Sequence, residues 1–239
     1  MLLNNIECFN RNINTIHKYH HQKKSLNILV KQEDPIRTKF PSFVSNVNEN
    51  IISIIKKLLI VLYDDNNIYA RFAALELIAR VPYFSYISVL HLQETLGKRD
   101  NDDIQSNLSQ IHFKETENEK IHLLIMEDLG GNKEFKHRLY AQHIAFAYYW
   151  IVVIIYLISP STAYDLNYHV EKHAFNTYDN YLKENENQLK EQHEIPEIAQ
   201  EYYNSLNRNV KTLYDVFKEI RDDEAEHSDM MVMLRETKC

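Results

Sequence analysis

Apolar residues recur along most of the chain at spacings of three and four positions, which is typical of amphipathic helices. No stretch stands out for the alternation of apolar and polar residues that marks a strand. The pattern predicts a strongly apolar helix at 51–63, long helical segments at 68–96, 103–129, 134–158, 161–189 and 211–236, and a short helix after Pro196. The predicted fold class is therefore all-α.

Residues 1–48 differ from the rest, because they are rich in Asn, Lys and His and show little apolar periodicity. We interpret them as a polar N-terminal arm and residues 49–239 as one helical domain. Inside the domain, Pro82 predicts a kink, since proline cannot donate a helical hydrogen bond. The pair Gly130-Gly131 predicts the end of the helix before it. Ser161 or Thr162 could cap the helix that follows.

Two stretches, 51–63 and 144–158, are apolar enough to meet a membrane but shorter than the roughly 20 residues that a spanning helix needs. Lys56 and Lys57 lie within the first of them. Such stretches favour a buried helix or one that lies on a membrane surface. We expect the apolar faces of 51–63 and of 71–96 to lie in one leaflet.

Composition narrows the class of protein. Only three glycines occur in 239 residues, which disfavours dinucleotide-binding and phosphate-binding loops. The net charge of −7 argues against nucleic acid as a partner. Cys8 and Cys239 stand near the two ends, so no disulfide framework is indicated. The first 30 residues lack the apolar core of a signal peptide.

Two Glu-x-x-His motifs, Glu119 with His122 and Glu224 with His227, fall on separate predicted helices. Residues three positions apart share one helix face, so each pair can bind the same metal ion. Spacing alone is a weak signal, because such a motif also arises by chance. A third copy at 134–137 lies near a helix start among charged neighbours, and we exclude it.

Two further glutamates, Glu76 and Glu171, each lie in an apolar helical segment. Buried glutamates are rare unless they are paired or bound to metal, although either residue could instead face solvent. Taken in chain order with the two motifs, they would place metal ligands on four of the long predicted helices. That ligand set is found in ferritin-like di-iron four-helix bundles, and its oxygen-rich chemistry suits iron or manganese better than zinc or copper.

Several stretches closely resemble the alternative oxidase family, above all its plastid terminal oxidase branch. They are LELIARVPYFSYISVLHLQETLG, NEKIHLLIMEDLGG, AQHIAFAYYW, SPSTAYDL, VEKHAFNTYDNYL and LYDVFKEIRDDEAEH, and together they cover roughly residues 71–230. The resemblance implies a monotopic membrane protein with a di-iron centre, a helical bundle with additional short helices. It also implies the metal ligands, which carry over onto Glu76, Glu119, His122, Glu171, Glu224 and His227.

The resemblance places further site residues. Tyr178 corresponds to a redox-active tyrosine, and it stands seven positions after Glu171, on the same helix face. Arg71, Leu75 and Thr177 correspond to residues of a quinone pocket. Each could instead be an ordinary core or surface side chain.

Two neighbours of the ligand glutamates, Asn118 and Asp223, are candidates for hydrogen bonds to the ligand histidines. Tyr164 stands where the alternative oxidases have a histidine, as in the plastid branch, which leaves the partner of the quinone headgroup open.

The function that the resemblance implies is oxidation of plastoquinol, or of ubiquinol, coupled to reduction of O2 to water without proton pumping. We expect two iron ions, a homodimer, and an interfacial location on a thylakoid or other photosynthetic or respiratory membrane. A ubiquinol-type alternative oxidase, a di-iron hydroxylase of quinone biosynthesis and a non-catalytic iron-binding bundle are the alternatives.

Overall fold

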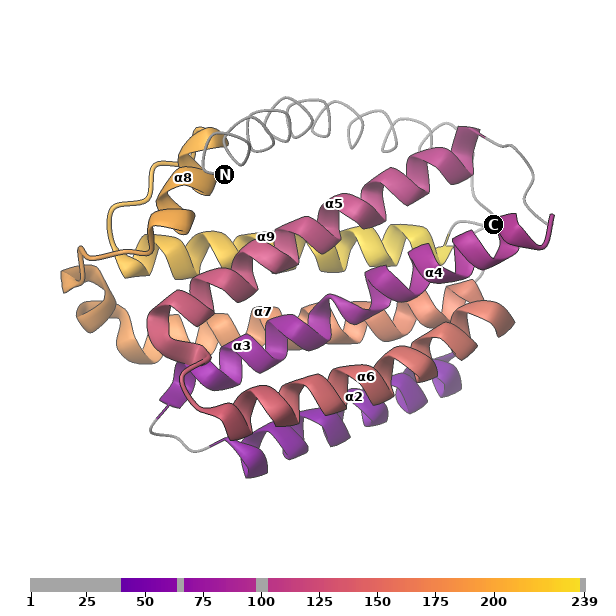
Figure 1. The fold of residues 1–239 in the computed structure, drawn as a ribbon, viewed down its shortest axis with the longest axis horizontal. Helices are drawn as coiled ribbons and strands as arrows, with labels where there is room; N and C mark the ends of the chain where they lie inside the picture. The colour runs from indigo at the N-terminus through magenta and orange to yellow at the C-terminus, as the bar shows by residue number, and fades with distance from the viewer. Residues whose placement is uncertain (1–39, 64–66, 98–102, 237–239) are drawn as a thin grey trace.

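The computed structural model describes residues 40–63, 67–97 and 103–236, and every regular element in these ranges is helical (Figure 1). The prediction of an all-α fold is therefore confirmed. The elements are α2 (Ser42–Leu62), α3 (Ile68–Ala79), α4 (Val81–Thr95), α5 (Asp103–Met126), η2 (Glu127–Gly131), α6 (Phe135–Ile158), α7 (Pro160–Glu191), α8 (Glu197–Ser205) and α9 (Leu213–Glu236). Cys8, Cys239 and most of the predicted arm lie outside the described residues.

Four helical segments form the bundle that carries the site: the α3–α4 pair, α5, α7 and α9. Helix α7 packs along α9, α3 packs on α5, and α4 packs on both α5 and α6. The remaining long helices lie outside this bundle, α2 against α7 and α6 against α3, α4 and α7. Figure 1 draws α2 and α6 along the lower edge of the molecule and α5 and α9 above them.

The kink predicted at Pro82 is confirmed as a break between α3 and α4. Arg80 joins the two helices with near-helical dihedral angles, φ −66° and ψ −25°. Pro82 occupies the first turn of α4, where a missing N–H costs least. The Phe84 N–H donates to the Arg80 carbonyl at 3.2 Å, so the hydrogen-bond ladder resumes directly after the break.

Helix α5 ends earlier than the predicted Leu129, because η2, a turn of π-helix, follows Met126. Gly130 in that turn has φ +101°, a left-handed conformation that favours glycine. Gly131 is needed for another reason. A Cβ there would lie 2.6 Å from the Tyr69 carbonyl oxygen and 2.7 Å from the Met126 carbonyl oxygen. The turn can therefore touch α3 only through a glycine.

Two other helix starts differ from the prediction. Helix α2 begins at Ser42, so the end of the predicted polar arm is helical. Asn48 explains this, because its side chain is buried and donates to Asp165 Oδ2 on α7 at 2.8 Å. Helix α7 is capped by Ser159, whose hydroxyl accepts from the Thr162 N–H, and not by either of the two residues predicted as caps.

Two segments are long and apolar enough to cross a membrane by length and composition alone, 68–95 and 135–158. The first is 67% buried inside the protein, so α3 and α4 mainly form the core. The second, α6, is only 33% buried and exposes several large apolar side chains, among them Phe146, Trp150 and Ile154. Within 71–96, the exposed large apolar side chains are Phe84 and Leu92 on α4 and Leu96 directly after it, and α6 exposes more of them.

Candidate metal centre

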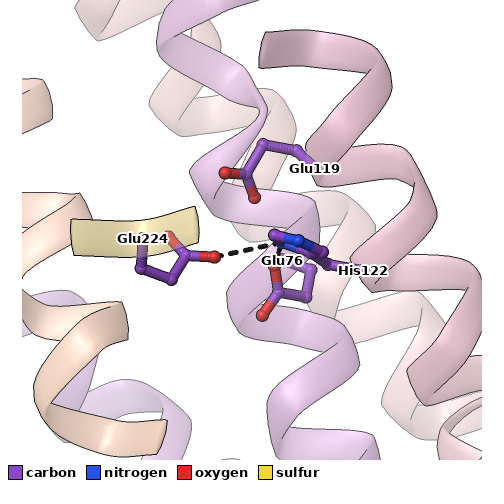
Figure 2. Close-up of side chains that lie close together, drawn as sticks. All are labelled: Glu76, Glu119, His122 and Glu224. Atoms are coloured by element: carbon purple, nitrogen blue, oxygen red, sulfur yellow. Dashed lines mark hydrogen bonds and ion pairs between the residues drawn. The ribbon is translucent and has the colours of Figure 1, made fainter. Parts of the chain in front are cut away.

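The four bundle segments bring all six predicted ligands together in the interior. These six residues are at most 3% exposed. They form two overlapping groups in which the candidate ligand atoms lie within 4.8 Å of one another. The first group is Glu76, Glu119, His122 and Glu224, and the second is Glu119, Glu171, Glu224 and His227. The first group is drawn in Figure 2, where side chains from three helices converge.

The histidines face the carboxylates through the same ring nitrogen. His122 Nδ1 lies 3.1 Å from Glu224 Oε1, the contact that is dashed in Figure 2, and 3.6 Å from Glu76 Oε2. His227 Nδ1 lies 2.8 Å from Glu119 Oε1 without the geometry of a hydrogen bond. Both imidazoles therefore present Nδ1 to the space between the glutamates.

Carboxylates packed so closely cannot all remain ionised without a counter-charge. Burial, and then the neighbouring Glu119, raise the pKa of Glu171 to about 8. Burial, and then the charge of Glu224, raise the pKa of Glu119 well above its usual range. Burial followed by the charge of Glu76 does the same for Glu224. In the absence of metal, protons must therefore take the place of cations.

The donor atoms fit a pair of iron ions. Each of the four glutamates has a buried oxygen with no hydrogen-bond partner among the described residues: Glu76 Oε2, both oxygens of Glu119, Glu171 Oε2 and Glu224 Oε2. Buried polar atoms of this kind are costly unless a ligand satisfies them. Four carboxylates balance the charge of two divalent ions. Oxygen ligands together with one imidazole for each metal ion suit iron.

The outer nitrogen of each histidine contacts a carboxylate on the opposite helix. His122 Nε2 lies 3.3 Å from Asp223 Oδ2, as the sequence led us to expect. His227 Nε2 lies 2.7 Å from Glu115 Oε2, a residue that the sequence analysis missed. Asn118 does not take that place; its amide donates to Asp223 and to the Tyr202 hydroxyl.

Asp223 is itself held by several donors. Arg208 Nη1 lies 2.5 Å from its Oδ1, and the Tyr203 hydroxyl donates to Oδ2 at 3.3 Å. Burial acts to raise the pKa of Asp223, but His122 and Arg208 together hold it well below the usual range. An ionised Asp223 fixes the proton of His122 on Nε2 and leaves Nδ1 for the centre.

Two tyrosines donate to site glutamates. The Tyr178 hydroxyl donates to Glu76 Oε1, so the predicted proximity of Tyr178 to the centre is seen in the structure. Tyr83 was not predicted, and its hydroxyl donates to Glu171 Oε1 at 2.9 Å. The available signal was its spacing, since Tyr83 follows Glu76 by the same seven positions that separate Tyr178 from Glu171.

A pocket of about 520 Å³ lies beside the centre and contains all three residues predicted for quinone binding, Arg71, Leu75 and Thr177. Its walls come from α2, α3 and α7. Phe72 also lines it and stacks on Tyr178 with ring centroids 4.5 Å apart, so one ring separates the pocket from the tyrosine. Tyr164 is not among the described residues that line the pocket; its hydroxyl lies 3.3 Å from His112 Nε2.

The sequence matches a family model and several known proteins. The family model for alternative oxidase matches residues 20–236. The chain is 44% identical over 202 residues to "Ubiquinol oxidase 4, chloroplastic/chromoplastic" of Arabidopsis thaliana, which covers 77% of this chain and 56% of that protein. It is 30% identical over 160 residues to "Ubiquinol oxidase 2, mitochondrial" of Glycine max, covering 67% of this chain and 46% of that protein.

The chain thus spans about half the length of the relatives it matches, and its identity to the chloroplast protein exceeds that to the mitochondrial one. The family match covers nearly the whole chain, including all four helices that supply the candidate ligands. The chain belongs to the alternative oxidase family.

Proposed function

We propose that this chain is a di-iron quinol oxidase, which couples oxidation of plastoquinol or ubiquinol to reduction of O2 to water without pumping protons. One observation carries the proposal: four buried glutamates and two histidines converge beside a pocket that one aromatic ring separates from a tyrosine of the centre. The names of the chloroplast and mitochondrial relatives support a quinol substrate.

In this proposal, Glu119 and Glu224 would contribute to both metal positions, because they belong to both groups of candidate ligands. Glu76 and His122 would complete one position, and Glu171 and His227 would complete the other. Bound iron supplies the one-electron steps that reduction of O2 requires.

The pocket binds the quinol. Arg71 and Thr177 provide polar contacts for its headgroup and Leu75 an apolar wall. Tyr178 holds its hydroxyl proton toward Glu76 Oε1 and lies between the pocket and the ligands. Burial raises the pKa of Tyr178 well above its usual range, so its phenol keeps that proton until it is oxidised.

The exposed apolar side chains of α2 and α6 provide the surface that lies on the membrane. A helix that presents such a face binds in the interfacial plane rather than across the bilayer. We place the protein on a thylakoid or other photosynthetic or respiratory membrane, as a homodimer that pairs through its apolar helices.

Oxygen uptake by membranes that contain the protein tests the proposal, with short-chain plastoquinol or ubiquinol as substrate and cyanide present. We expect cyanide-resistant uptake that Glu119→Gln abolishes, because this change removes a carboxylate shared by both metal positions. Glu117→Gln on the same helix is the control, since that side chain is exposed.

The other outcomes separate the alternatives. Uptake that survives in Glu119→Gln would disprove the metal assignment. A hydroxylated quinone product would indicate a hydroxylase, and bound iron without uptake from either quinol would indicate an iron-binding bundle. The ratio of the two rates chooses between plastoquinol and ubiquinol.

A further inference from the structure

Tyr83 has no role in the function described so far, yet it touches the centre as closely as Tyr178 does. Its side chain is fully buried, and its hydroxyl donates to Glu171 Oε1 at 2.9 Å. Tyr178 donates to Glu76 Oε1 in the same way. Each of the two candidate ligand glutamates outside the Glu-x-x-His motifs therefore accepts a hydrogen bond from one phenol.

The two hydrogen bonds occupy the same carboxylate oxygen in the two glutamates and leave the other one without a hydrogen bond from the described residues. In both Glu76 and Glu171, Oε1 accepts from a tyrosine, and Oε2 has no hydrogen-bond partner in the described part of the chain. Each Oε2 in turn faces a histidine Nδ1, at 3.6 Å between Glu76 and His122 and at 3.9 Å between Glu171 and His227. The oxygen left over by the phenol is the one that points into the centre.

The two hydrogen bonds run in opposite directions between the α3–α4 pair and α7. Tyr178 lies seven positions after Glu171 on the same face of α7, and Tyr83 lies seven positions after Glu76 across the break between α3 and α4. Each nevertheless bonds to the glutamate of the other segment. Equal spacings can cross in this way only when the segments run antiparallel in one fixed register.

The histidines repeat the same crossed arrangement. His122 on α5 contacts Asp223 on α9, and His227 on α9 contacts Glu115 on α5. The centre is thus built as two similar halves, in each of which a partner from the opposite helix holds a ligand side chain. In this arrangement, Tyr83 is the counterpart of Tyr178 in the other half of the centre.

The two tyrosines differ in what surrounds them. Tyr178 stacks on Phe72, which lines the pocket. Tyr83 instead has His112 at 5.7 Å and His227 at 6.1 Å between ring centroids, and neither histidine lines the pocket. Tyr83 is therefore suited to hold a ligand rather than to contact a quinol.

We propose that Tyr83 is a positioning residue for Glu171, as Tyr178 is for Glu76. Its O–H fixes Oε1 and withdraws negative charge from the carboxylate, while Oε2 stays directed at the metal position. The inference rests on the proposed metal centre but not on the identity of the substrate. Burial raises the pKa of Tyr83 well above its usual range, which keeps the phenol protonated as the donor.

A double-mutant cycle on the metal-free protein tests the hydrogen bond. Thermal unfolding is compared for Tyr83→Phe, Glu171→Ala and the double variant. We expect the two changes to be non-additive, because they remove the same contact. Tyr63→Phe in place of Tyr83→Phe is the matched control, since that hydroxyl is also buried but donates to the His137 carbonyl oxygen at 2.7 Å and not to Glu171. It should combine additively with Glu171→Ala.

The reduction potential of the iron-loaded protein tests the positioning role without any quinol. Loss of the phenol makes Glu171 a stronger donor, so the potential of Tyr83→Phe should fall, as should that of Tyr178→Phe, while Tyr63→Phe stays at the wild-type value. Coupling without a change in potential would reduce Tyr83 to a structural role, and a change in potential without coupling would exclude the hydrogen bond as its cause. Either result overturns the inference.

The proposed function can fail separately. A protein that shows both effects but takes up no oxygen from quinol keeps the role of Tyr83 and loses the oxidase assignment. A protein that binds no iron loses both.

Discussion

Single carboxylates that look alike in the sequence have different roles in this molecule. Glu115 and Glu117 stand two positions apart on α5, in the acidic run KETENEK. Glu115 is buried against His227, whereas Glu117 is exposed and pairs with Lys120. Two positions correspond to about 200° around a helix, so the phase of α5 separates the two roles.

Replacing Glu115 should therefore weaken metal binding, whereas replacing Glu117 should not. Glu115→Gln removes the charge behind His227, and loss of such a partner typically lowers metal affinity by about 10–100-fold. Glu117→Gln makes the same charge change on the same helix. Titration of the metal-free protein with Co(II), followed by visible absorption, measures both affinities. Equal affinities in the two variants would contradict this role for Glu115.

The sequence predicted the residues that meet in the centre better than it predicted their outer partners. The Glu-x-x-His spacings and the family resemblance located all six candidate ligands, because a ligand pair needs only a shared helix face. Glu115 and Tyr83 were missed because each contacts a ligand on a different helix. Such a contact depends on how far one helix is shifted along the other, which the sequence pattern does not show. The same reasoning named Asn118 as a candidate partner of a ligand histidine, whereas its amide donates to Asp223 and to the Tyr202 hydroxyl.

At the scale of elements, the pattern located the helices but not their ends. The break at Pro82 followed from the chemistry of proline. The early start of α2 did not, because it depends on the contact of Asn48 with Asp165, which is distant in sequence. The π-turn η2 was also missed, because Gly130-Gly131 suggests a simple helix end and shows nothing of the contact with α3.

That contact makes Gly131 a strict requirement. In Gly131→Ala the new Cβ must displace α3 near Tyr69, two turns before Glu76 on the same helix. We expect the free energy of unfolding to fall by about 1–3 kcal/mol, as for overpacking in general, and metal binding to weaken. Calorimetry and Co(II) titration measure the two effects.

Gly97→Ala is the matched control for this prediction. Gly97 also has a positive φ, +66°, but a Cβ there meets no atom of the described residues within 4 Å. The control should cost about 1 kcal/mol from backbone strain and leave metal binding unchanged. Weakened metal binding in Gly97→Ala but not in Gly131→Ala would refute the assigned role of η2.

For the molecule as a whole, metal ions and protons compete for the carboxylates of the buried glutamates. The folded metal-free protein holds protons on Glu119, Glu171 and Glu224 that the unfolded chain loses above about pH 4.3. Groups with raised pKa values stabilise the fold at low pH, and that contribution is lost as the pH rises through their folded pKa values, about 8 for Glu171. Asp223 acts in the opposite direction, because its lowered pKa contributes stability that is lost only as the pH falls into strong acid.

The metal-free protein should therefore lose stability between about pH 6 and about pH 9, at up to about 1.4 kcal/mol per pH unit for each proton released. Divalent metal replaces those protons, so the gain in melting temperature on adding Fe(II) without oxygen should be larger at the higher pH. Scanning calorimetry at both pH values, with and without metal, measures this difference. A metal-free protein that gains stability toward pH 9 would contradict the assignment of protons to the glutamates.

Helix α2 has two faces with different tasks. Its inner face is fastened to α7 by Asn48 and contributes Leu59 to the pocket wall, while Val61 near its end is 80% exposed. Whatever holds the outer face in place also sets the shape of the pocket. By thermodynamic reciprocity, a molecule that fills the pocket must change how strongly α2 holds to a surface by the same factor as the surface changes the affinity of the pocket. The protein would then sense its own substrate through the strength of its attachment.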